Sequence, residues 1–139
     1  MSISKCIAEW LQGFVGDAEI IDIDQLAAAP DAYGLFRSPE TIVTPFINGS
    51  RDVSAYYQFV IRKQSQTDAQ RIENAEMLEN LERWMHAQNI KRTLPQLGAG
   101  RVCYSIAVNG GMALETQDDA ASEYQIIIHI NYFDGSDTE

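Results

Sequence analysis

Apolar residues near the start of the chain recur at the spacing of one helical face. The positions on this face are Ile3, Ile7, Trp10, Leu11 and Phe14. Ser2 or Ser4 is placed to cap the start of such a helix, and Gly13 or Gly16 is placed to end it. The pattern therefore predicts a short amphipathic helix that packs against the rest of the domain.

The middle of the chain predicts a second, longer helix, from about Asp68 to Asn89. Thr67, followed three residues later by Gln70, has the spacing of a capping box. The apolar stripe consists of Ile72, Ala75, Leu78, Leu81, Trp84 and Met85. The polar positions between them are Glu73, Glu76, Glu79, Asn80, Glu82 and Arg83. At roughly 1.5 Å per residue this helix is on the order of 33 Å long, so we expect a central packing element with an acidic outer side.

Alternating apolar and polar residues predict strands in three places. In the strand from Val53 to Arg62, the inward positions are Val53, Ala55, Tyr57, Phe59 and Ile61. In the strand from Glu123 to Phe133, they are Tyr124, Ile126, Ile128, Ile130 and Tyr132. The third strand alternates with Val102, Tyr104, Ile106 and Val108 on one face. After it, the sequence Asn109 to Gly111 predicts a hairpin turn into a shorter strand, Met112 to Glu115.

The signal is weaker between Asp17 and Asn48. Glu19 to Ile23 is compatible with a strand, but four residues interrupt the remainder, namely Pro30, Gly34, Pro39 and Pro45. We expect irregular, extended structure in this region.

Taken together, these elements predict an α+β fold. Its mainly antiparallel sheet packs against one long helix and a short N-terminal helix. The 139 residues fit a single domain spanning 1–139. The last residues, Asp134 to Glu139, are acidic and are expected to be frayed.

Charge narrows the possible partners. Ten basic residues stand against twenty acidic ones, which gives a net charge of −10. Such a chain repels phosphates, so specific nucleic-acid binding is not expected. The apolar stretch from Ile3 to Val15 carries Glu9 and is shorter than a membrane span. We therefore expect no membrane contact, and synthesis in the cytoplasm.

Residue patterns typical of catalysis or cofactor binding are absent from the sequence. The residues best suited to metal binding are His86, His129, Cys6 and Cys103. They share no ligand spacing, so we expect no metal, a structural His129 and two buried free thiols. Nucleophile elbows, Walker loops and GxGxxG turns are also missing. Neither an enzyme nor a cofactor is therefore expected.

Tyr56 is a candidate contact residue of a different kind. Tyr56 and Tyr57, beside Arg62 and Lys63, could form a stacking surface for single-stranded nucleic acid, but the net charge opposes this. Alternation places Tyr57 on the core face and Tyr56 outside. An outward aromatic residue on a strand is typical of a protein contact.

Several local runs occur in the order found in one known family. They are Gly34, Leu35 and Pro39, then FINGS at Phe46 to Ser50, the strand ending YQFVIRKQS, Arg71, Ile72 and Asn74, Trp84 with Gln88 and Asn89, LPQL at Leu94 to Leu97, and YQI at Tyr124 to Ile126. From about Tyr33 to Tyr132, the chain resembles the small minor capsid or tail-terminator-like proteins of tailed phages and prophages of Gram-positive bacteria.

The resemblance implies a structural virion protein at the head–tail junction. Such a protein ends the tail tube, acts as a hexameric ring, and contacts copies of itself, the tail tube protein and a head-completion or connector protein. From loop position and exposure we place subunit or partner contacts at Phe46, Asn48, Arg51, Tyr56 and Asn109. From charge we place an acidic lumen face at Asp118 and Asp119, which lie in a polar connection between strands.

Three other functions stay open. A head-completion or connector adaptor shares the small size and the ring assembly. An acidic DNA-mimic inhibitor would fit the net charge, although the carboxylates are scattered along the chain and not in a double row. An acyltransferase-like enzyme ranks last, because a base–nucleophile pair is missing from the pattern.

Overall fold

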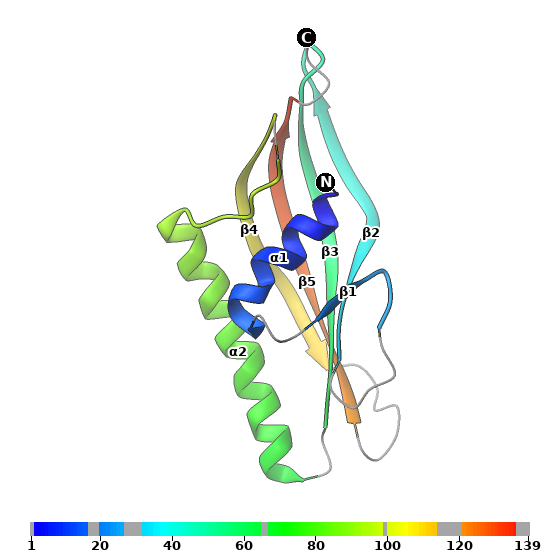
Figure 1. Cartoon of the computed structure of the whole chain (residues 1–139), viewed down its shortest axis with the longest axis vertical. Helices are drawn as coiled ribbons and strands as arrows, with labels where there is room; N and C mark the ends of the chain where they lie inside the picture. Colours follow the sequence, from blue (N-terminus) through cyan, green and yellow to red (C-terminus); the bar gives the residue numbers. More distant parts are fainter. Residues whose placement is uncertain are drawn as a thin grey trace.

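A computed structural model of the chain describes residues 2–16, 20–26, 32–64, 67–98, 100–113 and 121–135. Along the chain the elements are α1 (Ile3–Val15), β1 (Ile21–Ile23), β2 (Ala32–Pro45), β3 (Arg51–Gln64), α2 (Asp68–Lys91), β4 (Arg101–Ala113) and β5 (Ala121–Asp134). Figure 1 shows a long sheet with α1 lying across it and α2 running along its β4 side. The predicted α+β class is confirmed.

The sheet has five strands in the order β1-β2-β3-β5-β4. Of the strand pairs that the structure describes, β1 with β2 is parallel and the other three are antiparallel, so the expectation of a mainly antiparallel sheet is correct. β3 and β5 form the centre and pair along their whole length, from Arg51 opposite Asp134 to Gln64 opposite Ala121. Their predicted inward residues are all buried, and they form the core together with residues of the helices.

The first helix begins and ends where the pattern predicts. Ser2 caps α1, and its hydroxyl accepts a hydrogen bond from the backbone N–H of Lys5 at 3.1 Å. Gly16 ends the helix with φ of 104°, a conformation that favours glycine. Gly13 lies inside the helix instead, where a Cβ would stand only 3.2 Å from the Trp84 ring. Its missing side chain therefore lets the two helices approach.

Aromatic contacts join α1 to α2. The ring centroids of Trp10 and Trp84 are 4.6 Å apart, and those of Phe14 and Trp84 are 5.8 Å apart. The indole N–H of Trp10 also donates to the carbonyl of Thr93 at 2.9 Å, just beyond the end of α2. These contacts hold both helices as one layer on the sheet.

The second helix has the predicted capping box at Thr67 and Gln70, but its buried stripe differs from the predicted one. Leu81 and Met85 are buried, whereas Ile72 and Ala75 near the start are exposed. The buried residue of the first turns is Asn74, whose amide donates to the Tyr124 hydroxyl at 3.3 Å. A buried hydroxyl needs a polar partner, which turns Asn74 and not Ile72 toward the sheet.

The expectation of irregular structure before Asn48 is wrong for residues 32–45. They form β2, which pairs with β3 along its length. Among the described residues, β1 pairs with β2 only from Tyr33 to Leu35, so a proline farther along β2 removes no ladder hydrogen bond to β1. Pro39 lies in an irregularity of the pairing between Arg37 and Thr41, and Pro45 is the last residue of the strand.

The interpretation of β4 needs two corrections. The pairing register shifts between Cys103 and Ser105, so Cys103 faces the core while Val102 and Tyr104 are exposed. A second shift, between Val108 and Gly111, shows that the Asn109–Gly110 pair forms a bulge within one strand and not a hairpin turn. An extra residue in a strand reverses the alternation after it, which sequence periodicity does not reveal.

Two expectations about single residues also have clear outcomes. Cys6 and Cys103 are buried free thiols, as predicted. Asp134, expected to be the first residue of a frayed tail, is instead the last residue of β5; it is buried and accepts a hydrogen bond from Arg51 at 3.1 Å. Residues 136–139 lie outside the described part of the chain. None of the described helices is both long and apolar enough to cross a membrane.

Candidate interaction surfaces

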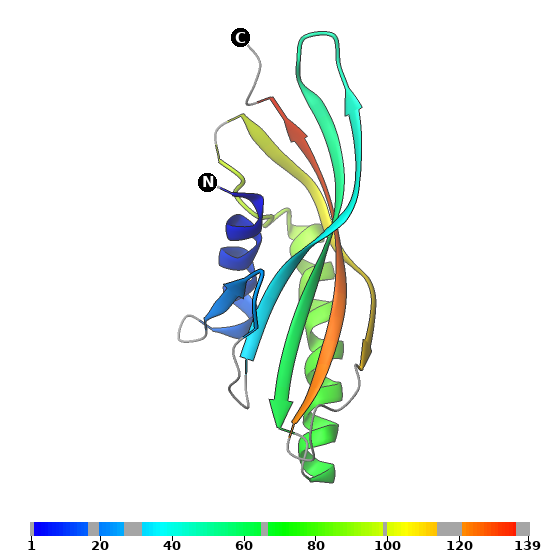
Figure 2. The same cartoon turned by 90° about the vertical axis from the view of Figure 1, so that its right-hand side faces the viewer.

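The end of the β2–β3 hairpin forms an arm, which we define as residues 41–52. Its turn, residues 46–50, projects beyond the rest of the sheet, because β5 pairs with β3 only up to Arg51. Both cartoon views show its tip extending past the ends of β4 and β5 (Figures 1 and 2). The turn is closed by backbone hydrogen bonds from Phe46 to Ser50, at 2.8 Å, and from Gly49 to Phe46, at 3.1 Å. Asn48 adds two more, because its side-chain oxygen accepts from the N–H and the hydroxyl of Ser50. These hydrogen bonds therefore fix the conformation of the turn at the tip.

The arm exposes apolar side chains on both sides and at its end. The exposed fractions are 65% for Ile42, 46% for Val43, 45% for Phe46 and 109% for Ile47. From Thr41 to Ser50 the chain has no charged residue, although charged residues make up 22% of the sequence. Interface cores are depleted in charge and enriched in apolar and aromatic residues, so the arm has the composition of a protein contact.

The structure brings three of the five proposed contact residues together on the arm. Phe46 and Asn48 form its tip, and Arg51 lies at its base, paired with Asp134. Tyr56 lies lower on β3, on the face away from the helices, as predicted. Asn109 is placed in the bulge of β4, two strands away from β3. Asp118 and Asp119 lie outside the described residues, and so does the connection that contains them.

The face of the sheet opposite the helices carries a polar cluster on β3 and β5. The ring of His129 stacks on Tyr56 with centroids 4.6 Å apart and an angle of 9°. Nε2 of His129 lies 2.5 Å from the hydroxyl of Ser54. The predicted structural histidine therefore has a partner on its ring face and another at Nε2.

A serine next to a histidine can also act as a nucleophile with its base, so we compared this pair with that geometry. Ser54 lies in β3, opposite Ile42 on β2 and Asn131 on β5. His129 lies in β5, opposite Tyr56 on β3 and Ala107 on β4. Both residues are therefore within strands that are paired on each side. Backbone N–H groups within paired strands are engaged in the ladder, whereas an oxyanion hole requires donors that point at the substrate. The arrangement favours a structural hydrogen bond over acyl transfer.

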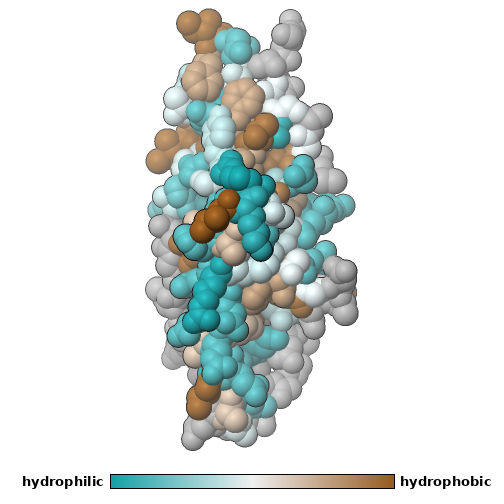
Figure 3. All heavy atoms as spheres, turned by 90° about the vertical axis from the view of Figure 1, so that its left-hand side faces the viewer, coloured by the Kyte–Doolittle hydropathy of each residue, from teal (hydrophilic) through white to brown (hydrophobic). Residues whose placement is uncertain are grey.

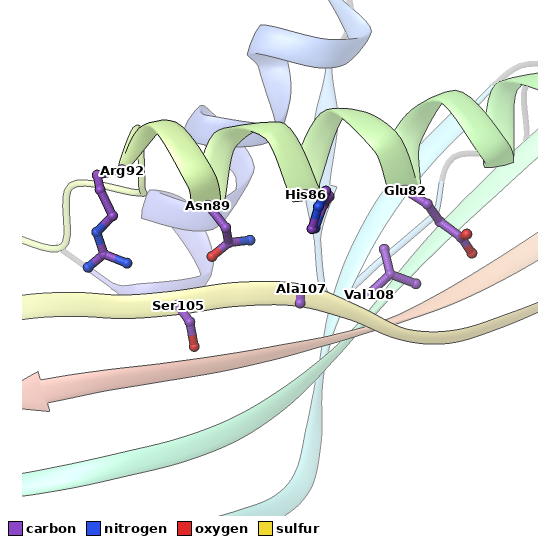
Figure 4. A pocket seen from close by; sticks show the side chains of 7 residues that line it. All are labelled: Glu82, His86, Asn89, Arg92, Ser105, Ala107 and Val108. Atoms are coloured by element: carbon purple, nitrogen blue, oxygen red, sulfur yellow. The ribbon is translucent and has the colours of Figure 1, made fainter.

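A groove of about 530 Å³ lies between α2 and β4. Figure 4 shows Glu82, His86, Asn89 and Arg92 along the helix side, with Ser105, Ala107 and Val108 on the strand. Asn89 bridges the strand: its side-chain oxygen accepts from the Ile106 N–H at 3.0 Å, and its amide donates to the Ile106 carbonyl. Arg92 donates to the carbonyl of Tyr104 at 2.8 Å.

These contacts cover the backbone edge of β4, which is an edge strand of the sheet. An uncovered edge presents free N–H and C=O groups to other strands. The polar groups of Asn89 and Arg92 are thus used within the molecule, and they do not converge on the groove. Glu82 and His86, also on the helix side, are exposed, and the Ser105 hydroxyl accepts a hydrogen bond from the Asn131 amide at 3.2 Å.

Among the described residues, no three His, Cys, Asp or Glu side chains are grouped closely enough to hold a metal ion. The buried Cys103 has a pKa raised to about 11, because burial disfavours the thiolate. Its thiol is therefore protonated at neutral pH, which is the opposite of what a reactive cysteine requires.

Sequence reasoning identified Phe46 but missed the other exposed apolar residues of the arm, above all Ile47. The signal that could have revealed them is the uncharged stretch from Thr41 to Ser50 in an otherwise charged chain. The bonds of Asn89 to β4 had no sequence signal, because they depend on the docking of α2. No family model matches the chain, and no curated protein matches its sequence.

Proposed function

We propose that this protein is a structural component of a phage virion that terminates the tail tube and forms part of the head–tail joint. In this proposal it acts as a hexameric ring and contacts the tail tube protein, a head-completion or connector protein, and copies of itself. The order of the short sequence stretches between Tyr33 and Tyr132 is the basis for proposing this family. The arm is the structural observation that carries the proposal.

A joint protein must hold two partners apart at a fixed distance while binding each of them. The continuous β3–β5 pairing supplies a rigid support, and the arm offers an apolar contact at one end of it. Exposed apolar residues of this kind cost solubility in a protein that works alone. Their presence on a projecting, well-formed turn favours a protein whose working state is an assembly.

The test is electron microscopy of an induced lysate from which the gene has been deleted in its own genome. We expect heads accompanied by unattached tails, some of them longer than normal, and recovery of infectious particles when the gene is supplied in trans. Normal tails beside leaking heads would instead assign the protein to head completion. Infectious particles at the normal yield would refute a virion role.

A further inference from the structure

The two edges of the sheet differ in charge. β1 forms one edge. Asp22 lies on this strand, and the exposed Asp24 follows it. Glu9 of α1 is exposed nearby, on a groove of about 420 Å³ between α1 and β1. Lys5 is the basic residue that lines this groove. The described residues around β1 are therefore net acidic.

The part of the opposite edge that lies beside the C-terminal end of α2 is basic. Residues 84–114 contain Lys91, Arg92 and Arg101 and no aspartate or glutamate, in a chain with twenty acidic residues. Lys91 and Arg92 are exposed at the end of α2, and the bond of Arg92 to Tyr104 fixes that end against β4. A groove of about 410 Å³ lies here, with Arg92, Leu94 and Val102 among its lining residues.

Each edge also exposes apolar side chains beside its charges. Ile20 and Ile23 are 74% and 37% exposed at the β1 edge. Ile90 and Val102 are 70% and 56% exposed on the β4 side. Figure 3 shows this β4 side, where hydrophobic side chains gather toward the upper end and the lower part is mainly hydrophilic. Apolar residues framed by charges are the usual anatomy of a protein interface.

We infer that the basic β4 edge of one copy binds the acidic β1 edge of the next copy. The inference rests on the proposed ring and names its subunit contact. A second copy is the occupant because the two edges are complementary in charge and lie at opposite ends of the strand order in one sheet. A different protein could be complementary in charge to one edge but would leave the complementarity between the two edges without a role.

The asymmetry of this contact fits the ring of the proposed function. Two different surfaces meet, so the contact is heterologous, and repeated head-to-tail contacts close into a ring when the rotation allows it. Copies with a net charge of −10 repel one another at long range. Edges of opposite sign offset that repulsion locally and set the orientation of each copy.

The test uses two charge-reversed variants of the purified chain. Glu9→Lys with Asp22→Lys makes both edges basic, and Lys91→Glu with Arg92→Glu makes both edges acidic. We expect the wild-type protein to sediment as a ring-sized oligomer, and each variant alone to associate at least about tenfold more weakly. An equimolar mixture of the two variants should assemble again, with the two kinds of copy alternating.

The matched control is Glu76→Lys with Glu79→Lys, which makes the same charge change on the exposed side of α2. It should assemble like the wild type. A misfolded variant would not be rescued by mixing, so rescue separates lost complementarity from lost structure. The inference is wrong if the wild type is monomeric throughout a dilution series, if either variant assembles normally, or if the mixture does not assemble.

This experiment is independent of the lysate experiment. Normal assembly of the charge-reversed variants, together with unattached tails in the deletion lysate, would reject this contact and keep the proposed function. Rescue by mixing, together with infectious particles in the deletion lysate, would keep the contact and reject the function.

Discussion

Cys103 illustrates how one extra residue changes the chemistry of its neighbours. The bulge at Tyr104 turns Cys103 into the core and exposes the tyrosine, which donates to Asp52 at 3.0 Å. Burial then raises the pKa of the thiol to about 11. Burial also raises the pKa values of Tyr57 and Tyr132, so all three groups favour the same protonated state in the folded chain.

This predicts a loss of stability at alkaline pH. A thiol whose pKa is higher in the folded state contributes stability that is fully present below its unfolded pKa, about 8.5. That contribution is lost as pH rises toward about 11. Denaturant unfolding at a series of pH values should show the decline, and the Cys103→Ala variant should show a shallower one. Equal slopes for the variant and the wild type would contradict the assignment to Cys103.

At the scale of elements, α2 both covers the core and protects an edge strand. Its last turns supply Asn89 and Arg92 to the backbone of β4, while its first turns leave Ile72 exposed. The helix is therefore held most firmly at its C-terminal end, where Trp84 and Met85 also pack. An edge strand bonded to side chains in this way has fewer free groups for pairing with other chains.

Replacing Asn89 with alanine should loosen this end of the fold. The half-buried N–H and C=O groups of Ile106 would lose their partner, which costs about 1–3 kcal/mol in the free energy of unfolding. Hydrogen exchange should show faster exchange of the Ile106 amide, and denaturant unfolding should show the loss of stability. Asn80→Ala, on the exposed side of the same helix, is the control and should change neither measurement. Unchanged exchange at Ile106 in the Asn89 variant would reject the bridge.

At the scale of the whole molecule, the sheet supports an arm at one end and carries edges of opposite charge. The helices and the core keep β3 and β5 rigid, so the arm holds its position relative to both edges. In the proposed function, the edges join copies side by side and the arm reaches a different protein. The two kinds of contact should therefore be separable by mutation.

A variant with Phe46→Ser and Ile47→Ser tests that separation. Both side chains are exposed, so the free energy of unfolding should change by less than about 0.5 kcal/mol. Self-association should stay normal, whereas phage carrying the variant should release heads and tails that are not joined. Thr44→Ser, an exposed position on the same arm, is the control and should leave infectivity unchanged. Normal infectivity of the double variant would exclude the arm as a partner contact.

Much of the fold could be predicted where one physical signal was decisive. The alternation in β3 and β5 identified their buried residues, because a strand in the middle of a sheet keeps its period when nothing interrupts it. The capping box at Thr67 was equally clear, because it depends only on local hydrogen bonds. The contact residues were harder: Phe46 and Asn48 were placed on a loop, but the projecting arm that presents them was not foreseen.

The sequence by itself determined the class, the two helices, the central strands and the buried cysteines, because these depend on local spacing and hydrophobicity. The tertiary structure decided the rest. Pairing with β3 made a strand of a proline-containing segment, and two bulges set the exposure of Val102, Tyr104 and Cys103. The strand order placed acidic and basic segments on opposite edges. Such features depend on partners far along the chain, and no local pattern encodes them.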